Sequence, residues 1–262
     1  MTRRAEPLTL AAVYATLIAV AAFWGAAAGL LVPRAAYRLS VEPEEAWRDT
    51  CPAGHSFAGP AQGWLGGARC APCAAAVATT QRHLQAPLVP LVTALSCAAL
   101  AAATGLRPEL AVWLLLAPFA VLLAQVDRNV HRLPDQLTLP LAAAAAVLLG
   151  LAALLPADAG SWPTALLGGL VLGAAYFVLF LIHPNGMGFG DVKLALSLGV
   201  ALGWYGWTVL FTGAFAGFLL GSLYGVGLMV LRRANRKTAI PFGPFMIVGA
   251  LAGLLLGGLA AG

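Results

Sequence analysis

The chain has 262 residues, of which 61% are hydrophobic and only 10% are charged, and its mean hydropathy is +0.87. An average soluble domain is about 45–50% apolar and about 25% charged. This composition therefore excludes an ordinary soluble globule and also a disordered chain. The net charge of +5 does not indicate nucleic-acid binding, because the 15 cations form no basic stripe. We predict an all-α polytopic membrane protein.

Apolar runs divide the chain into spans of the length that a bilayer requires, which is about 20 residues for a helix. The first run follows two arginines and is interpreted as a retained helix rather than a cleaved signal peptide. One stretch is long enough for two spans, and glycines with Trp204 and Trp207 as interface anchors break it. We predict about eight transmembrane helices, in Leu8–Val32, Pro87–Thr104, Pro108–Val126, Leu137–Leu155, Pro163–Ile182, the two parts of Val192–Leu231, and Pro244–Ala261.

The cations predict the orientation of these helices. The loops that follow the first, third, fifth and seventh helices hold 12 of the 15 Lys and Arg residues. Because cytoplasmic loops carry an excess of Lys and Arg, we expect those loops in the cytoplasm and both termini outside. The 12 residues are Arg34, Arg38, Arg48, Arg69, Arg82, Arg128, Arg132, Lys193, Arg232, Arg233, Arg236 and Lys237.

The composition also predicts three parts along the chain. Residues 1–32 form a tail and the first helix, and residues 87–262 form a seven-helix membrane domain. Between them lies a polar, Pro- and Gly-rich cytoplasmic loop domain of residues 33–86, which is too small to bury a large core of its own.

Three aspartates stand out because a charge inside a membrane is expensive, at least about 2.5–3.5 kcal/mol at the centre of a helix. Asp127, Asp135 and Asp191 all lie at predicted cytoplasmic helix ends. Asp135 follows Pro134 ahead of an apolar run, so an N-cap is its simplest interpretation. Asp127 ends a helix, where an anion is unfavourable. Asp191 follows Gly188 and Gly190 and precedes a short helix, so either a helix cap or a site within a buried loop fits it.

Two such carboxylates could meet in the folded bundle and share one proton. The ionised carboxylate would activate a water and the neutral one would polarise a peptide carbonyl, with no metal needed. This is the chemistry of an aspartic protease. The alternative is a small transporter whose intramembrane acids carry protons or ions.

The motifs around these aspartates resemble those of the bacterial type IV prepilin leader peptidases, which are aspartyl proteases of the GxGD class. Asp127 with His131–Pro140 is similar to the first-aspartate segment of that family, and Gly186–Leu194 to its second. Ile240–Phe245 resembles its C-terminal I-P-F-G-P motif, and Gly29–Leu39 weakly resembles the end of its first helix. The matches extend over nearly the whole chain.

The resemblance implies that Asp127 and Asp191 are the catalytic pair, supported by Asp135, Gly188, Gly190 and Lys193. It also implies cleavage of the basic leader of type IV prepilins or pseudopilins, after a glycine at the cytoplasmic face of the bacterial inner membrane. The apolar segment of the substrate would stay among the membrane lipids.

Many members of the family also methylate the new N-terminus with S-adenosylmethionine and carry a loop with two Cys-x-x-Cys pairs. In this chain Cys70 and Cys73 form one pair, but Gly54 stands where the partner of Cys51 is expected, and His55 follows it. Three thiolates and one imidazole form a known structural zinc set. These residues allow two interpretations, which are a zinc site of Cys51, His55, Cys70 and Cys73 or a degenerate loop that binds no metal.

Overall fold

The computed structural model describes residues 5–42, 44–66, 70, 72–73, 88–184, 186–231 and 240–261. This part of the chain is helical apart from turns, loops and one isolated β-bridge. The all-α membrane class is thus confirmed. The helices are α1 (Ala5–Gly29), α2 (Val32–Leu39), α3 (Pro60–Gly63), α5 (Leu88–Thr104), α6 (Glu109–Val130), α7 (Asp135–Ala152), α8 (Trp162–Ile182), α9 (Phe189–Gly203), α10 (Trp207–Val230) and α11 (Gly243–Ala260).

Six segments of the described chain are long and apolar enough to cross a bilayer: α1 together with α2, and α6, α7, α8, α10 and α11. The other two predicted spans exist as helices but are shorter, with 17 residues in α5 and 15 in α9. At about 1.5 Å per residue, α9 is about 22 Å long, less than the hydrocarbon core of about 30 Å.

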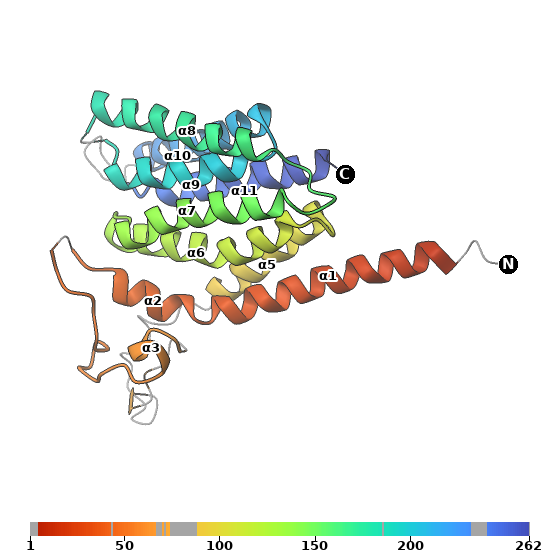
Figure 1. Cartoon of the computed structure of the whole chain (residues 1–262). Helices are drawn as coiled ribbons and strands as arrows, with labels where there is room; N and C mark the ends of the chain where they lie inside the picture. Colours follow the sequence, from red (N-terminus) through yellow and green to blue (C-terminus); the bar gives the residue numbers. More distant parts are fainter. Residues whose placement is uncertain are drawn as a thin grey trace.

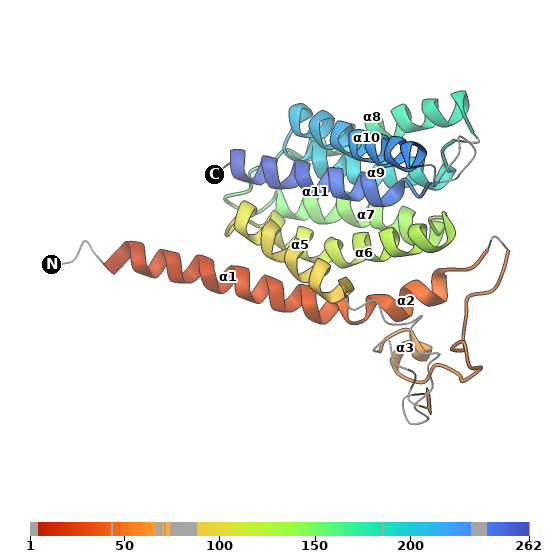
Figure 2. The same ribbon diagram turned by 180° about the vertical axis from the view of Figure 1, so that it is seen from behind.

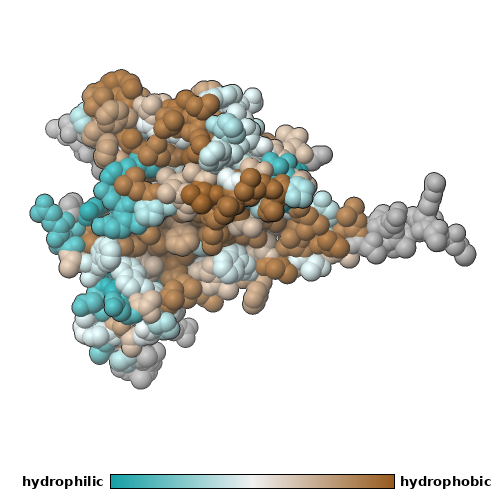
Figure 3. Space-filling view, viewed as in Figure 1, coloured by the Kyte–Doolittle hydropathy of each residue, from teal (hydrophilic) through white to brown (hydrophobic). Residues whose placement is uncertain are grey.

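The long helices lie side by side in one bundle (Figure 1). Helix α1 packs against α5, and its N-terminal half projects beyond the bundle (Figure 2). Helices α2 and α3 lie at one end of the bundle and the C-terminus lies at the other. Apolar residues cover much of the face in Figure 3, and hydrophilic residues gather at the end that carries α2 and α3. This distribution is that of a protein embedded in lipid.

The short helix α9 lies inside the bundle, where α7, α8, α10 and α11 surround it. Ten of its 15 residues are buried. Its contact with α8 depends on glycines, since a Cβ atom at Gly199 would lie 2.5 Å from the carbonyl oxygen of Gly168. Close backbone approach through small residues is how membrane helices gain packing energy. Because protein surrounds α9, its short length exposes no backbone to lipid.

The break between α9 and α10 lies where the sequence predicts it. Gly206 has a φ of 98°, which favours glycine, and α10 begins at the next residue. One interpretation was wrong, because Trp204 is only 1% exposed and packs in the core instead of anchoring at the interface. Gly160 leaves space for its indole ring, so the loop before α8 covers the residue that we expected to face the headgroups.

Helix α2 joins the predicted loop domain to the bundle. Its apolar side packs against Leu122 and Val126 of α6. Its two arginines are buried by the loop, with the Arg34 guanidinium 5.2 Å from the Phe57 ring and that of Arg38 4.1 Å from the Trp64 ring. The predicted boundary at residues 86/87 lies outside the described residues, as do Arg69, Arg82, Arg232, Arg233, Arg236 and Lys237.

Candidate active site

Asp127 lies in the last turn of α6 and is only 4% exposed. Its Oδ2 atom accepts a hydrogen bond of 2.9 Å from the backbone N–H of Gly243, the first residue of α11. The anion that is unfavourable at the end of its own helix therefore meets the start of another, where free N–H groups and the helix dipole stabilise negative charge. The C-terminal I-P-F-G-P motif thus forms one wall around Asp127.

Asp191 lies in the first turn of α9 and is 7% exposed. Gly188 is the N-cap, and its N–H donates to Asp191 Oδ2 at 3.1 Å, while the Asp191 N–H donates to the Gly188 carbonyl at 3.0 Å. Asp191 is therefore the third residue of the helix, reaching back to the cap. The interpretation of Asp191 as the N-cap was thus wrong, because Gly188 is the N-cap and the buried Asp191 side chain bonds to it from inside the helix.

The two aspartates come from α6 and α9, and α11 contacts both helices. Their carboxylates are close enough to interact electrostatically. The fold thus brings together the two acids that the sequence singled out, in a buried position at one end of the bundle. A buried pair of this kind can hold one proton between two carboxylates, which suits water activation and carbonyl polarisation.

Asp135 and Lys193 link the two aspartate segments. The Lys193 Nζ atom lies 2.6 Å from Asp135 Oδ1 and 4.8 Å from the centre of the Phe189 ring. The N-cap interpretation of Asp135 was wrong, because Pro134 is the N-cap of α7 and Asp135 is the first helical residue. From that position its side chain, which is 59% exposed, pairs with Lys193 instead of the helix N–H groups.

Gly190 allows the two segments to approach. A Cβ atom at this position would lie 2.9 Å from Cβ of Leu133, which is itself 4% exposed. Gly188 has more space, since its nearest contact would be Asp191 Oδ2 at 3.7 Å. Of the two glycines in the motif, Gly190 is thus required by packing and Gly188 serves through its N–H.

Sequence reasoning missed three residues of the site. Gly243 and Leu133 stood inside motifs that we quoted, but no role followed from their residue type. Tyr176 of α8 is 2% exposed and interacts electrostatically with Asp191. The centre of its ring lies 5.3 Å from the centre of the Phe218 ring. A tyrosine within an otherwise apolar run was the available signal for it.

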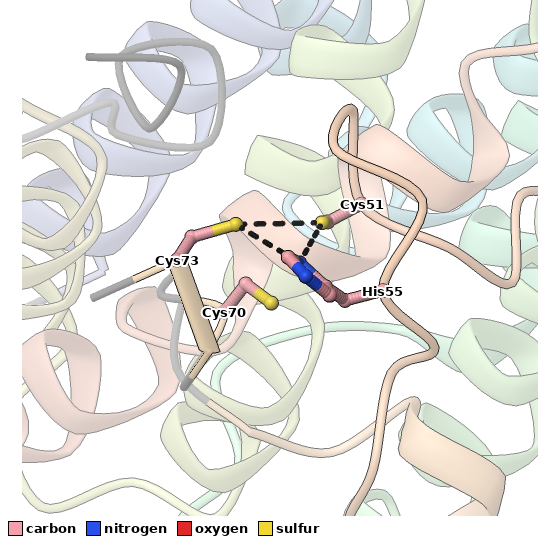
Figure 4. A group of neighbouring side chains, drawn as sticks. All are labelled: Cys51, His55, Cys70 and Cys73. Carbon is pink, nitrogen blue, oxygen red and sulfur yellow. Dashed lines mark hydrogen bonds between the residues drawn. The ribbon is translucent and has the colours of Figure 1, made fainter. Parts of the chain in front are cut away.

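A second cluster lies in the loop between α2 and α5 and shares no residue with the aspartates. The ligand atoms of Cys51, His55, Cys70 and Cys73 all lie within 4.8 Å of one another (Figure 4). Cys51 Sγ is 3.7 Å from Cys73 Sγ and 3.6 Å from His55 Nδ1, and the latter is 3.3 Å from Cys73 Sγ. Tetrahedral zinc with Zn–S bonds of about 2.3 Å would separate two sulfurs by about 3.8 Å. The donor set and its spacing therefore fit zinc.

The thiols of this cluster are not equivalent. Burial raises the pKa of Cys51, but N–H groups of His55 and Ala53 and contacts with the His55 and Cys70 side chains outweigh it and lower the value to about 6. Burial, together with the neighbouring sulfurs, raises the pKa of Cys73 to about 11. No disulfide joins the three cysteines of the cluster. A bound divalent cation would compensate the charge of several thiolates at once.

Comparison with known proteins gives a match to a protein family and matches to curated relatives. Residues 114–230 match the Type IV leader peptidase family. The chain is 35% identical over 195 residues to a protein of Aeromonas salmonicida named prepilin leader peptidase/N-methyltransferase, and the match covers 74% of this chain and 64% of that protein. Proteins of the same name from Aeromonas hydrophila and Pseudomonas aeruginosa are 36% and 34% identical, over 74% and 73% of this chain and 64% and 63% of theirs.

The chain thus spans about 64% of the length of these curated relatives. No solved structure gives a significant match. The comparisons give no support to the alternative of a small transporter. The family match covers α6 from its sixth residue, all of α7, α8 and α9, and α10, and hence both buried aspartates. Residues 114–230, which hold both buried aspartates, are thus similar to the type IV leader peptidase family.

Proposed function

We propose that this protein is an aspartic endopeptidase that removes the basic leader of type IV prepilins or pseudopilins. Asp127 and Asp191 are its catalytic residues, one ionised to activate water and the other protonated to polarise the scissile carbonyl. The observation that carries the proposal is the burial of these two carboxylates within electrostatic reach of each other, each accepting an N–H at the start of a helix.

The surroundings support this assignment. The residues that position the pair all come from motifs that the resemblance singled out: Gly188 and Gly190 around Asp191, and Lys193, which joins Asp135 to α9. We propose no metal or organic cofactor for proteolysis, because two carboxylates can activate the water and polarise the carbonyl by themselves. The names of the relatives, which specify prepilin leaders, give the substrate class.

The test co-expresses a prepilin with the full chain and follows the size of the prepilin on a gel. The wild-type protein should convert it to the mature size, and Asp127→Ala and Asp191→Ala should leave it uncut while still inserting in the membrane. Asp158→Ala is the matched control, because this acid lies in the loop between α7 and α8, distant in sequence from both motifs, and it should cleave normally. Full processing by the Asp191→Ala protein would refute the proposal.

We further propose that the protein lies in the bacterial inner membrane with the aspartates facing the cytoplasm. Two features support this location. The loops in which the sequence concentrates Lys and Arg are those expected on the side of the aspartates, where the positive-inside rule expects the cytoplasm. A membrane peptidase must also meet its leader on the side where prepilins are made. Residues 1–32, 33–86 and 87–262 then serve as anchor, cytoplasmic loop domain and peptidase domain.

N-methylation of the new N-terminus with S-adenosylmethionine is a second activity, favoured by the names of the relatives. The loop domain lies beside the peptidase site, since Asn129, two residues after Asp127, donates a 3.1 Å hydrogen bond to Ser40 at the end of α2. Mass spectrometry of the mature pilin from the same cells tests it. A methyl group on the N-terminal amine is expected, and an unmodified amine would contradict it.

The Cys/His cluster is proposed as a structural zinc site of the loop domain, held by Cys51, His55, Cys70 and Cys73. Metal analysis of the purified chain should give about one zinc per protein. Cys73→Ser should lose this metal, whereas Cys97→Ser should keep it, because Cys97 is buried alone in α5. A wild-type protein purified with far less than one zinc would remove the site.

A further inference from the structure

A cavity lies inside the bundle among α5, α6, α7, α9 and α11, and the proposed chemistry does not use it. Its lining is almost entirely apolar. Ser96 and Ser197 are exceptions, and the Ser197 hydroxyl is already occupied, because it donates to the Leu194 carbonyl at 2.8 Å. A cavity with so few free polar partners does not hold water well and favours an apolar occupant.

The cavity lies directly inward from the aspartates, on the same helices. Val121 lines it six residues before Asp127, and Ser197 lines it six residues after Asp191. At about 1.5 Å per residue, each lies about 9 Å further into the bundle than the aspartate. Ile247 is four residues from Gly243, or about 6 Å. The cavity therefore begins between one and two helical turns inward from the site.

Its far end lies about 16 to 21 Å from the site along the helices. Trp113 lines it 14 residues before Asp127, about 21 Å along α6, and Leu254 lines it 11 residues after Gly243, about 16 Å along α11. A helix whose cut bond lies at the aspartates would pass these depths with residues about 4 to 14 after the bond. In the proposed reaction, this part of the substrate is the apolar segment that stays in the bilayer.

We propose that the cavity is a specificity pocket that receives bulky apolar side chains from the transmembrane segment of the substrate. This inference rests on the proposed function and adds how the enzyme selects its substrates. Side chains fit better than a whole helix, because five helices already surround the space. An apolar pocket discriminates by size, and one methylene group changes the selectivity by about tenfold or more.

The test measures kcat/KM of the full-length protein for two prepilin peptides with the same basic leader and the same glycine before the bond. They differ only at residues about 4 to 14 after the bond, which are Leu-rich in one peptide and Ala-rich in the other. Ala145→Leu on α7 and Ala117→Leu on α6 fill the cavity from two walls. Each should lower the Leu-to-Ala ratio of kcat/KM by about tenfold, because only the bulky side chains compete for the space.

Ala143→Leu is the matched control, since Ala143 is exposed on α7 two residues from Ala145, and its ratio should equal that of the wild type. An unchanged ratio in both filling variants, as expected if a lipid chain occupies the cavity, would overturn the inference. An equal fall for both peptides would overturn it too, because it indicates a structural defect. A wild-type enzyme that cleaves neither peptide would instead refute the proposed function itself.

Discussion

Asp127 and Asp191 each accept a backbone N–H, and both donors are glycines. At Gly243 a Cβ atom would lie only 2.9 Å from Asp127 Oδ2, whereas at Gly188 it would lie 3.7 Å from Asp191 Oδ2. The first distance is too short for a carbon and the second is an ordinary contact. Similar hydrogen bonds therefore position the two aspartates, but only the Gly188 position has space for a side chain.

This difference predicts the outcome of two alanine substitutions. Gly243→Ala should lower kcat by about 10- to 100-fold, because the methyl group displaces the carboxylate from its position against the substrate. Gly188→Ala adds the same methyl group where there is space and keeps the N–H, so it should remain within a few fold of the wild type. Cleavage assays on both proteins compare them, and equal kcat values would show that the carboxylate adjusts freely.

The Asp135–Lys193 pair should matter less than the catalytic pair. Asp135 is 59% exposed, and exposed ion pairs contribute about 0.2–1 kcal/mol. Asp135→Ala and Lys193→Ala should each lower cleavage by only a few fold, and the double variant should lose no more than either single one. A double-mutant cycle in kcat/KM measures this, and a loss as large as that of Asp191→Ala would assign Asp135 a direct role.

At the scale of the helices, the sequence predicted most of the boundaries well. The predicted span Pro163–Ile182 differs from α8 by one residue, because long apolar runs between polar loops leave little choice. The start of α9 was placed too late, at Val192, although the helix begins at Phe189. Apolar counting cannot detect that the Gly188 N–H bonds to the Asp191 side chain and extends the helix across a charged residue.

Helix packing yields its own prediction. Gly199→Ala places a methyl group 2.5 Å from the Gly168 carbonyl oxygen, so α8 and α9 must separate, at a cost of about 1–3 kcal/mol. Gly227→Ala in α10 meets no atom within 4 Å and should leave stability unchanged or slightly raised. Thermal unfolding in detergent should give a lower Tm for the first variant only. Equal Tm values would mean that the contact between α8 and α9 is loose.

At the scale of the whole molecule, the sequence could predict the class of fold and could single out two aspartates that prove to be buried, but it could not predict which surfaces meet. Trp204 was expected at the interface and is buried, because the loop with Gly160 folds over it. Likewise, nothing in the residue pattern indicated that Gly243 would donate to Asp127, 116 residues away. Such contacts depend on how the helices pack, whereas hydropathy indicates only that the helices lie in the membrane.

The proposed orientation can be tested on intact spheroplasts with a maleimide that does not cross membranes. Leu154 lies in the loop after α7 and is 81% exposed. A Leu154→Cys protein should therefore be labelled at once. Arg128→Cys, an exposed position beside the aspartates, should be labelled only after the membrane is permeabilised. The wild-type chain controls for the four native cysteines. The reverse pattern would place the aspartates outside.

The central claim is that Asp127 and Asp191 act as one catalytic unit. The most direct measurement is the kcat for leader cleavage by purified Asp127→Asn, Asp191→Asn and the double variant, all checked for an unchanged Tm. Residues that act as a unit are strongly non-additive. We predict that each single variant loses nearly all activity and that the double variant loses no more. Appreciable cleavage by either single variant, or a double loss equal to the product of two moderate single losses, would contradict the account.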